Sequence, residues 1–316
     1  MQAPKAGKNG LKEDRTDLFS QSEVQKDGRS LADALPDLLI EARNVASTVA
    51  FGWHGRRRAG PGETFWQFRP FNPGEPMKRV DWRRSARDDH LYVREREWEA
   101  AHTVWLWSDL SKSMNFRSAL TDASKRDRAV VIMLGLAELL SRSGERIGLP
   151  GLMPPTTSRN GAEKLAQALI HADETAALPD SRVVKRFSDV VLFADLLDPI
   201  DEIRAWVSAV ASTGAGGHLV QILDPVEETF PFGGRTEFED PETGAKLITG
   251  RAQDWREAYQ GKMAERHQAL RTLSRKAGWT YIVHHTDRPA VEPLLALHNR
   301  LSGGDTVQNT RTGELQ

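Results

Sequence analysis

Apolar residues in this chain recur first at helical spacing and later in short runs. Between residues 31 and 49 they fall three or four positions apart, which predicts one amphipathic helix. Further along, short apolar runs predict buried strands at 103–109, 146–149, 188–195, 218–223 and 279–284. The stretches between these runs have the pattern of helices. Strands that alternate with helices favour an α/β fold with a mainly parallel, doubly wound sheet.

Local signals place the ends of several of these elements. A capping box at 124–127 begins the helix that follows the first strand. The pair Asp198-Pro199 predicts the N-cap and first position of another helix. The Pro- and Thr-rich residues 150–158 are expected to form a loop, and residues 235–249 a β-hairpin.

The segment 53–99 differs from the rest of the chain because it is rich in Arg and Trp. Six of the nine tryptophans lie within residues 53–107. Pro-Gly turns at 60–62 and 72–74 flank a predicted strand at 64–69, and a second strand is predicted at 90–94. This segment predicts a small β subdomain. The expected organisation begins with a disordered tail at 1–28, followed at 29–100 by an N-terminal helix with the Arg/Trp-rich β subdomain. An α/β domain is expected at 101–301 and a second disordered tail at 302–316.

Composition and charge narrow the classes of protein that fit. The chain has 316 residues, with 43 Lys and Arg against 44 Asp and Glu, so it lacks the basic surplus typical of nucleic-acid binders. It has no cysteine, which excludes disulfides and thiolate metal sites. No apolar run approaches the ~20 residues of a membrane-spanning helix. We expect a cytoplasmic protein with no membrane span and no nucleic-acid partner.

Candidate metal ligands follow two of the predicted strands. Asp109, Ser111 and Ser113 come after the strand 103–109, and Asp195 ends the strand 188–195. Because ligands of open α/β sheets bind beyond the carboxyl ends of strands, we expect these side chains to lie together. Carboxylate and hydroxyl oxygens suit Mg²⁺.

The pattern Asp109-x-Ser111-x-Ser113 after an apolar strand resembles the metal-ion-dependent adhesion site of von Willebrand factor type A domains. In that family a Thr from a second loop and an Asp from a third loop complete the site. The resemblance implies Asp195 in the third position and Thr157 in the second, with Thr156 and Ser158 as the alternatives in the same loop. It also implies Mg²⁺, or Mn²⁺ in its place, as the cofactor.

The Arg/Trp-rich segment resembles a bacterial family called domain of unknown function 58. The motifs that carry this resemblance include 60–65, 68–75, 79–83, 85–87 and 93–95. Members of the family place such a segment just before a type A domain. The resemblance also implies that the protein is a cytoplasmic partner of MoxR-type AAA+ ATPases. Four residues of these motifs are expected to fasten the β subdomain to the α/β domain by stacking and ion pairing: Arg69, Asp81, Trp82 and Arg87.

These observations favour a non-catalytic protein-binding adaptor that uses its cation to engage an acidic residue of a partner. The sequence lacks a G-x-S-x-G elbow, a phosphate-binding P-loop and an H-E-x-x-H motif. The alternative in another class is a metal-dependent phosphoester hydrolase in which Asp109 and Asp195 hold the ion. A third hypothesis is a nucleic-acid module that uses Arg56 to Arg58 with Trp53 and Trp66 as stacking surfaces.

Overall fold

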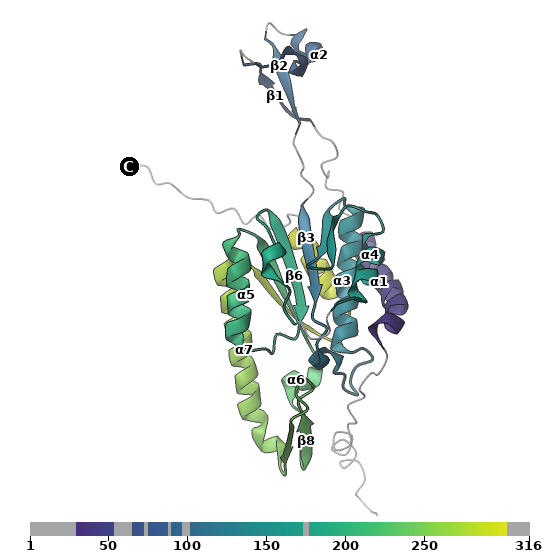
Figure 1. The fold of residues 1–316 in the computed structure, drawn as a ribbon, viewed down its shortest axis with the longest axis vertical. Helices are drawn as coiled ribbons and strands as arrows, with labels where there is room; N and C mark the ends of the chain where they lie inside the picture. Colours follow the sequence, from purple (N-terminus) through teal and green to yellow (C-terminus); the bar gives the residue numbers. More distant parts are fainter. Residues whose placement is uncertain are drawn as a thin grey trace, which may run out of the picture.

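The structure is a computed structural model that describes residues 30–53, 65–72, 75–87, 90–96, 102–172 and 177–301. The two predicted tails, most of the turn at 60–65 and the Arg56 to Arg58 cluster lie outside these residues. At its centre is a six-stranded sheet with the order β10-β7-β6-β3-β4-β5 (Figure 1). The strands of this sheet are β3 Thr103–Ser108, β4 Arg146–Leu149, β5 Met153–Thr156, β6 Ser188–Ala194, β7 Gly216–Leu223 and β10 Thr280–His285. All neighbours are parallel except β4 and β5, which confirms the predicted mainly parallel sheet.

The strand order contains one reversal point. Counted in chain order within this sheet, the strands run 3-2-1-4-5-6 from β5 to β10, an order common among doubly wound sheets. The first and fourth of these strands, β3 and β6, lie side by side in parallel. Ligands of such sheets bind at the carboxyl ends of the two strands where the order reverses. The residues after β3 and β6 therefore occupy the preferred binding position of the fold.

One predicted loop proved wrong. Residues 153–156 form the edge strand β5, which runs antiparallel to β4 and pairs Thr156 with Ile147. Proline lacks the amide hydrogen of a central strand but is tolerated at an edge, where one side of the strand has no neighbour. Pro154 and Pro155 therefore do not prevent a strand at this place in the sheet.

Helices cover both faces of the sheet. On one face α3 packs against α1, α4 and α8, and on the other α5 packs against α7 (Figure 1). The bounds of these helices are α1 Leu31–Trp53, α3 Lys125–Arg142, α4 Gly161–Leu169, α5 Ile200–Ser212, α7 Arg256–Ala277 and α8 Val291–Leu301. The buried side of α1, including Leu35 and Ala42, belongs to the same hydrophobic core as the sheet. The N-terminal helix is thus part of the α/β unit, in contrast to its expected grouping with the β subdomain.

The remaining elements are short. The β subdomain contains β1 Phe65–Pro70, η1 Met77–Arg79, α2 Trp82–Ser85 and β2 Tyr92–Arg96, with β1 and β2 antiparallel. The predicted hairpin is confirmed as β8 Thr236–Glu239 and β9 Lys246–Thr249. Short helical turns complete the fold: η2 Lys112–Asn115, η3 Ser181–Val183, α6 Pro225–Thr229 and η4 Ala252–Trp255.

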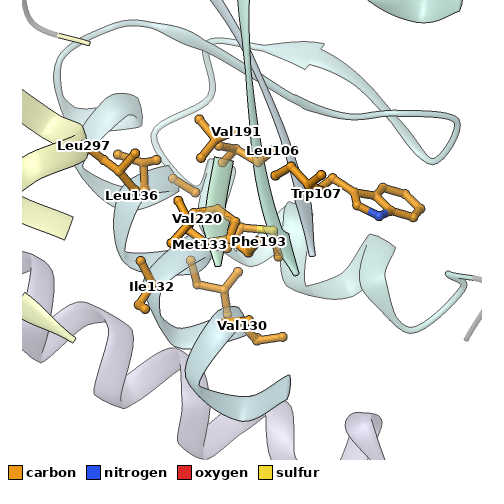
Figure 2. Close-up of a cluster of buried hydrophobic side chains, with 14 of the residues drawn as sticks. Leu106, Trp107, Val130, Ile132, Met133, Leu136, Val191, Phe193, Val220 and Leu297 are labelled. Carbon is orange, nitrogen blue, oxygen red and sulfur yellow. The ribbon is translucent and has the colours of Figure 1, made fainter. Parts of the chain in front are cut away.

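The core is centred on the contact between α3 and the middle strands. Figure 2 shows Leu106, Phe193 and Val220 from three adjacent strands beside Met133 of α3. Every residue of α3 from Ala129 to Ser141 is buried, as expected for a helix enclosed by the sheet and three other helices. None of the helices in the described part of the chain has both the length and the apolar character needed to cross a membrane.

A glycine in β7 is required by the packing of two tryptophans. A Cβ atom at Gly217 would lie 2.2 Å from Cδ2 of Trp279, whose indole is buried and packs edge-on against Trp206 at 5.8 Å. We expect Gly217→Ala to lower the free energy of unfolding by about 1–3 kcal/mol, because the ring must move within a filled core. Urea denaturation measures this loss.

The matched control is Gly261→Ala in α7, where a Cβ would meet nothing within 4 Å. It should be neutral or stabilise the protein by about 0.5–1 kcal/mol, since alanine favours the helix. Equal unfolding midpoints for the two variants would contradict the packing argument.

Candidate metal centre

The loop after β3 folds back on itself and brings its polar side chains together. Asp109 is 1% exposed, and its backbone N–H donates to the carbonyl of Phe193 in β6 at 2.8 Å. Its Oδ1 accepts a 2.8 Å hydrogen bond from the N–H of Ser111, as in an Asx-turn. The hydroxyls of Ser111 and Ser113 lie 3.1 Å apart. The three residues of the D-x-S-x-S pattern thus form one compact group.

Asp195, at the end of β6, joins this group. The hydroxyl of Ser113 donates to Asp195 Oδ2 at 2.8 Å, and the N–H of Leu197 donates to Oδ1 at 3.2 Å. Four of the five predicted metal ligands therefore lie together at the carboxyl ends of β3 and β6. The hydrogen bonds to both Asp195 oxygens show that one role of this carboxylate is to position Ser113.

Asp198 is a third carboxylate of the centre, and the sequence pattern did not indicate it as a ligand. Oxygen atoms of Asp109, Asp195 and Asp198 all lie within 4.8 Å of one another. Asp198 was expected to cap the next helix, but Pro199 is the N-cap of α5 and no side chain caps it. The only signal in the sequence was the position of Asp198 three residues after Asp195, in the loop at the binding edge of the sheet.

A buried lysine closes the inner side of the centre. The Nζ of Lys125, at the first position of α3, donates to Asp195 Oδ2 at 2.9 Å and to Glu227 Oε1 at 2.7 Å. The Lys125 side chain is 1% exposed. Glu227 also accepts from the N–H of Asp224 in the capping box of α6, so the lysine links the centre to that helix. The position of Lys125 in the capping box at 124–127 does not indicate that its side chain is buried.

Burial and charge set the ionisation of these groups. Burial, together with the nearby charge of Asp195, raises the pKa of Asp109 to about 7. Burial and Asp195 also raise the pKa of Asp198. Burial opposes the ionisation of Asp195, but Lys125 and the Ser113 hydroxyl hold its pKa below the ordinary value. Burial likewise opposes the charge of Lys125, yet Asp195 and Glu227 raise its pKa above the usual one.

The donor set fits a hard divalent cation. Asp109 Oδ2 is buried and has no hydrogen-bond partner among the residues that the structure describes. A buried carboxylate oxygen without a partner is costly unless a cation or donor satisfies it. The oxygens around it come from carboxylates and hydroxyls, which are ligands that Mg²⁺ and Mn²⁺ prefer. The groups that would hold the ion are Asp109, Asp198 and the Ser111 and Ser113 hydroxyls, with Asp195 behind them.

Thr157 does not belong to this centre, and the correction follows from the direction of β5. Thr156 pairs with Ile147, which in turn pairs with Val104 near the start of β3. Asp109 follows the far end of β3. It lies about 16 Å from Val104 along the strand, which rises about 3.3 Å per residue. Since β5 runs antiparallel, Thr157 and Ser158 continue away from the centre, and no member of this loop supplies the predicted hydroxyl.

Of the four predicted junction residues, Asp81 has a contact within the β subdomain itself. Asp81 caps α2 by accepting from the N–H of Arg84 at 2.9 Å. Trp82 is 57% exposed and Arg87 is exposed. Arg69 lies on β1, and its side chain is outside the described part of the chain. The fastening of the subdomain to the α/β unit stays a prediction.

Comparison with known proteins gives one family and several relatives. The family described as "Protein of unknown function DUF58" matches residues 67–269, a range that includes most of β1, all of β2 and the loops of the candidate metal centre. Uncharacterized proteins of Mycobacterium bovis and Mycobacterium tuberculosis are 27% identical over 237 residues, which cover 69% of this chain and 73% of theirs.

Two solved structures show weaker similarity. The conserved hypothetical protein BatB from Bacteroides thetaiotaomicron has a TM-score of 0.37 and 12% identity, covering 64% of this chain and 99% of its own. An aerotolerance-related membrane protein from Bacteroides fragilis has a TM-score of 0.35 and 16% identity, covering 63% and 99%.

Proposed function

From the premise that this chain belongs to the DUF58 family, we propose that it is a non-catalytic adaptor built on a von Willebrand factor type A-like domain. In this proposal a divalent cation, Mg²⁺ or Mn²⁺, binds beside Asp109 and engages an acidic residue of a partner protein. The family resemblance favours a MoxR-type AAA+ ATPase as that partner, in the assembly of protein complexes.

The observation that carries the proposal is the buried, unpartnered Asp109 Oδ2 among further oxygen ligands. Asp109 Oδ1 is occupied by the Ser111 N–H, whereas no group in the described residues satisfies Oδ2. Asp198 stands within reach as a second carboxylate. A cation between them would satisfy both, so this arrangement supports a metal site more directly than the D-x-S-x-S pattern alone.

The position of the centre in the fold is a second support. It lies at the carboxyl ends of β3 and β6, where the strand order reverses and ligands of doubly wound sheets bind. The antiparallel edge strand β5 runs away from it, so in this proposal the ligands beside Asp109 come from the loops after β3 and β6.

The chain's own residues prepare an anion-binding role for the ion. Lys125 neutralises part of the charge of Asp195, and Asp195 accepts from the Ser113 hydroxyl. Asp195 therefore adds less negative charge around the ion than a carboxylate without these partners would. A bound cation with few anionic protein ligands supplies positive charge that favours a carboxylate from a partner. The role is binding, and the proposal includes no chemical step.

The test is a thermal melt with and without Mg²⁺ or Mn²⁺, for the unaltered protein and for Asp109→Asn. The asparagine keeps the acceptor for the Ser111 N–H but removes the charged oxygen, so the variant should fold. At a hundredfold excess over Kd, metal binding stabilises by about 2.7 kcal/mol, which raises Tm by roughly 5–10 °C. Asp109→Asn should lose this rise.

The control is Asp122→Asn, an exposed aspartate before α3, which should retain the full rise. The absence of any metal-induced shift in the unaltered protein, supported by isothermal titration without heat, would refute the proposed function. An equal metal-induced rise of Tm in Asp109→Asn would show that the metal binds elsewhere on the protein.

A further inference from the structure

The β8–β9 hairpin brings an acidic side chain to the outer side of the metal centre. Glu242, in the turn of this hairpin, accepts a 2.8 Å hydrogen bond through Oε1 from the N–H of Ser113. The two residues are 129 positions apart in the chain. Ser113 is also the residue whose hydroxyl contacts Ser111 and Asp195, so a carboxylate from a distant segment touches the proposed ligand group.

The turn that carries Glu242 is held in one conformation by its own hydrogen bonds. Asp240 Oδ1 accepts from the N–H of Glu242 at 2.9 Å, and Asp240 Oδ2 accepts from the Thr243 hydroxyl at 2.5 Å. These two bonds lower the pKa of Asp240. The N–H of Gly244 donates to the Asp240 carbonyl, and Gly244 has the positive φ of 71° that favours glycine.

Strand β8 of the hairpin is anchored as well. Phe238 of β8 stacks on Phe230 with ring centroids 5.6 Å apart and on Trp255 at 6.2 Å. Phe230 is buried at the end of α6, the helix that Glu227 and Lys125 link to the metal centre. The hairpin is therefore fixed in β8 and in its turn, and it presents Glu242 at a defined place.

The two sides of the centre differ in exposure. Asp109, Asp195 and Lys125 are buried on the inner side, whereas Glu242 is exposed and approaches from the solvent. Oε1 of Glu242 makes the bond to Ser113, and no partner is found for Oε2 in the parts of the chain that the structure covers. The carboxylate thus comes from the direction in which a partner would approach.

We propose that Glu242 is an internal acidic ligand of the centre, which occupies the position that a partner's carboxylate takes. This inference rests on the proposed function, because it requires a cation beside Asp109. An attached carboxylate has an effective concentration in the millimolar range or above, so an isolated carboxylate in solution competes poorly with it. Only a partner with additional contacts displaces Glu242, and the hairpin thereby selects against nonspecific acidic ligands.

A simpler role for Glu242 would be to cap η2, since Ser113 lies in its first turn. Substitutions separate the two roles. Glu242→Gln keeps an oxygen acceptor for the Ser113 N–H but loses the anionic charge. Glu242→Ala removes both. A cap predicts that only the alanine variant changes, and that the change is in stability without metal.

The experiment titrates the full chain with Mn²⁺ and follows both affinity and the relaxation rate of water protons, which rises when water replaces a protein ligand on the ion. For Glu242→Gln we expect Mn²⁺ binding weakened by at least about tenfold, because losing even a hydrogen-bond partner of a ligand costs about 10–100-fold, and a higher relaxation rate per bound ion. Acetate, added as the carboxylate probe, should lower that rate in Glu242→Gln at concentrations that leave the unaltered protein unchanged.

The matched control is Glu237→Gln, which removes an equal charge from the same hairpin at a residue paired with Lys246. It should behave as the unaltered protein does. If Mn²⁺ binds, is lost in Asp109→Asn, and shows the same affinity and relaxation in Glu242→Gln, the internal ligand is refuted while the proposed function stands. If the unaltered protein binds no Mn²⁺, both fail together.

Discussion

Lys125→Met is expected to lower the free energy of unfolding by about 3–5 kcal/mol, the loss typical of removing one partner from a buried charge pair. Methionine has a similar length but no charge, so Asp195 and Glu227 would keep their buried carboxylates without the ammonium between them. The loss should appear as a lower midpoint in urea denaturation. A variant that does not fold at all would also agree with the predicted loss of stability.

Two further variants make this prediction specific. Lys112→Met removes an exposed lysine from η2 and should change stability by less than about 0.5 kcal/mol. Adding Glu227→Gln to Lys125→Met removes one of the stranded charges and should recover part of the loss. A Lys125→Met protein as stable as the unaltered chain would show that the two carboxylates do not depend on the ammonium.

Phe193→Ala is expected to cost about 3–5 kcal/mol, because it removes a fully buried aromatic ring and leaves a cavity. Phe193 is 0% exposed and lies in β6 beside Met133 and Val220 (Figure 2). Its backbone carbonyl also accepts from the N–H of Asp109, so β6 is bonded at this residue to the loop of the candidate metal centre. Chemical denaturation measures the loss.

The matched control is Phe187→Ala, six residues earlier, where the ring is 76% exposed. Its removal exposes no cavity and should change stability by less than about 0.5 kcal/mol. Similar losses at the two positions would contradict the location of the core in β6 and α3.

The α/β class could be predicted because five of the six central strands are apolar runs between helices. The sixth, β5, was expected to be a loop because its sequence begins Met153-Pro154-Pro155. Two prolines are unfavourable in a strand unless the strand lies at the edge of its sheet. Whether a strand lies at an edge depends on the arrangement of the whole sheet, which the local sequence does not indicate.

The candidate metal centre could likewise be predicted only in part. Asp109 and Asp195 follow parallel neighbouring strands, so their proximity follows from the topology. Thr157 failed because its place depends on the direction of β5. Lys125 contacts Asp195 across 70 positions and Glu227 across 102, and no local spacing encodes such contacts. Residues that are brought to a site by the packing of distant elements can be identified only from the three-dimensional structure.

The packing of α1 has a consequence for how the chain is held together. Because α1 is buried against α3 and α8, the β subdomain is an insertion between two elements of one core, α1 and β3. The chain connects it to the core at both ends, through α1 and through β3. A single backbone cut between α1 and β3 would leave both pieces attached, since the buried face of α1 still holds the N-terminal fragment to the rest.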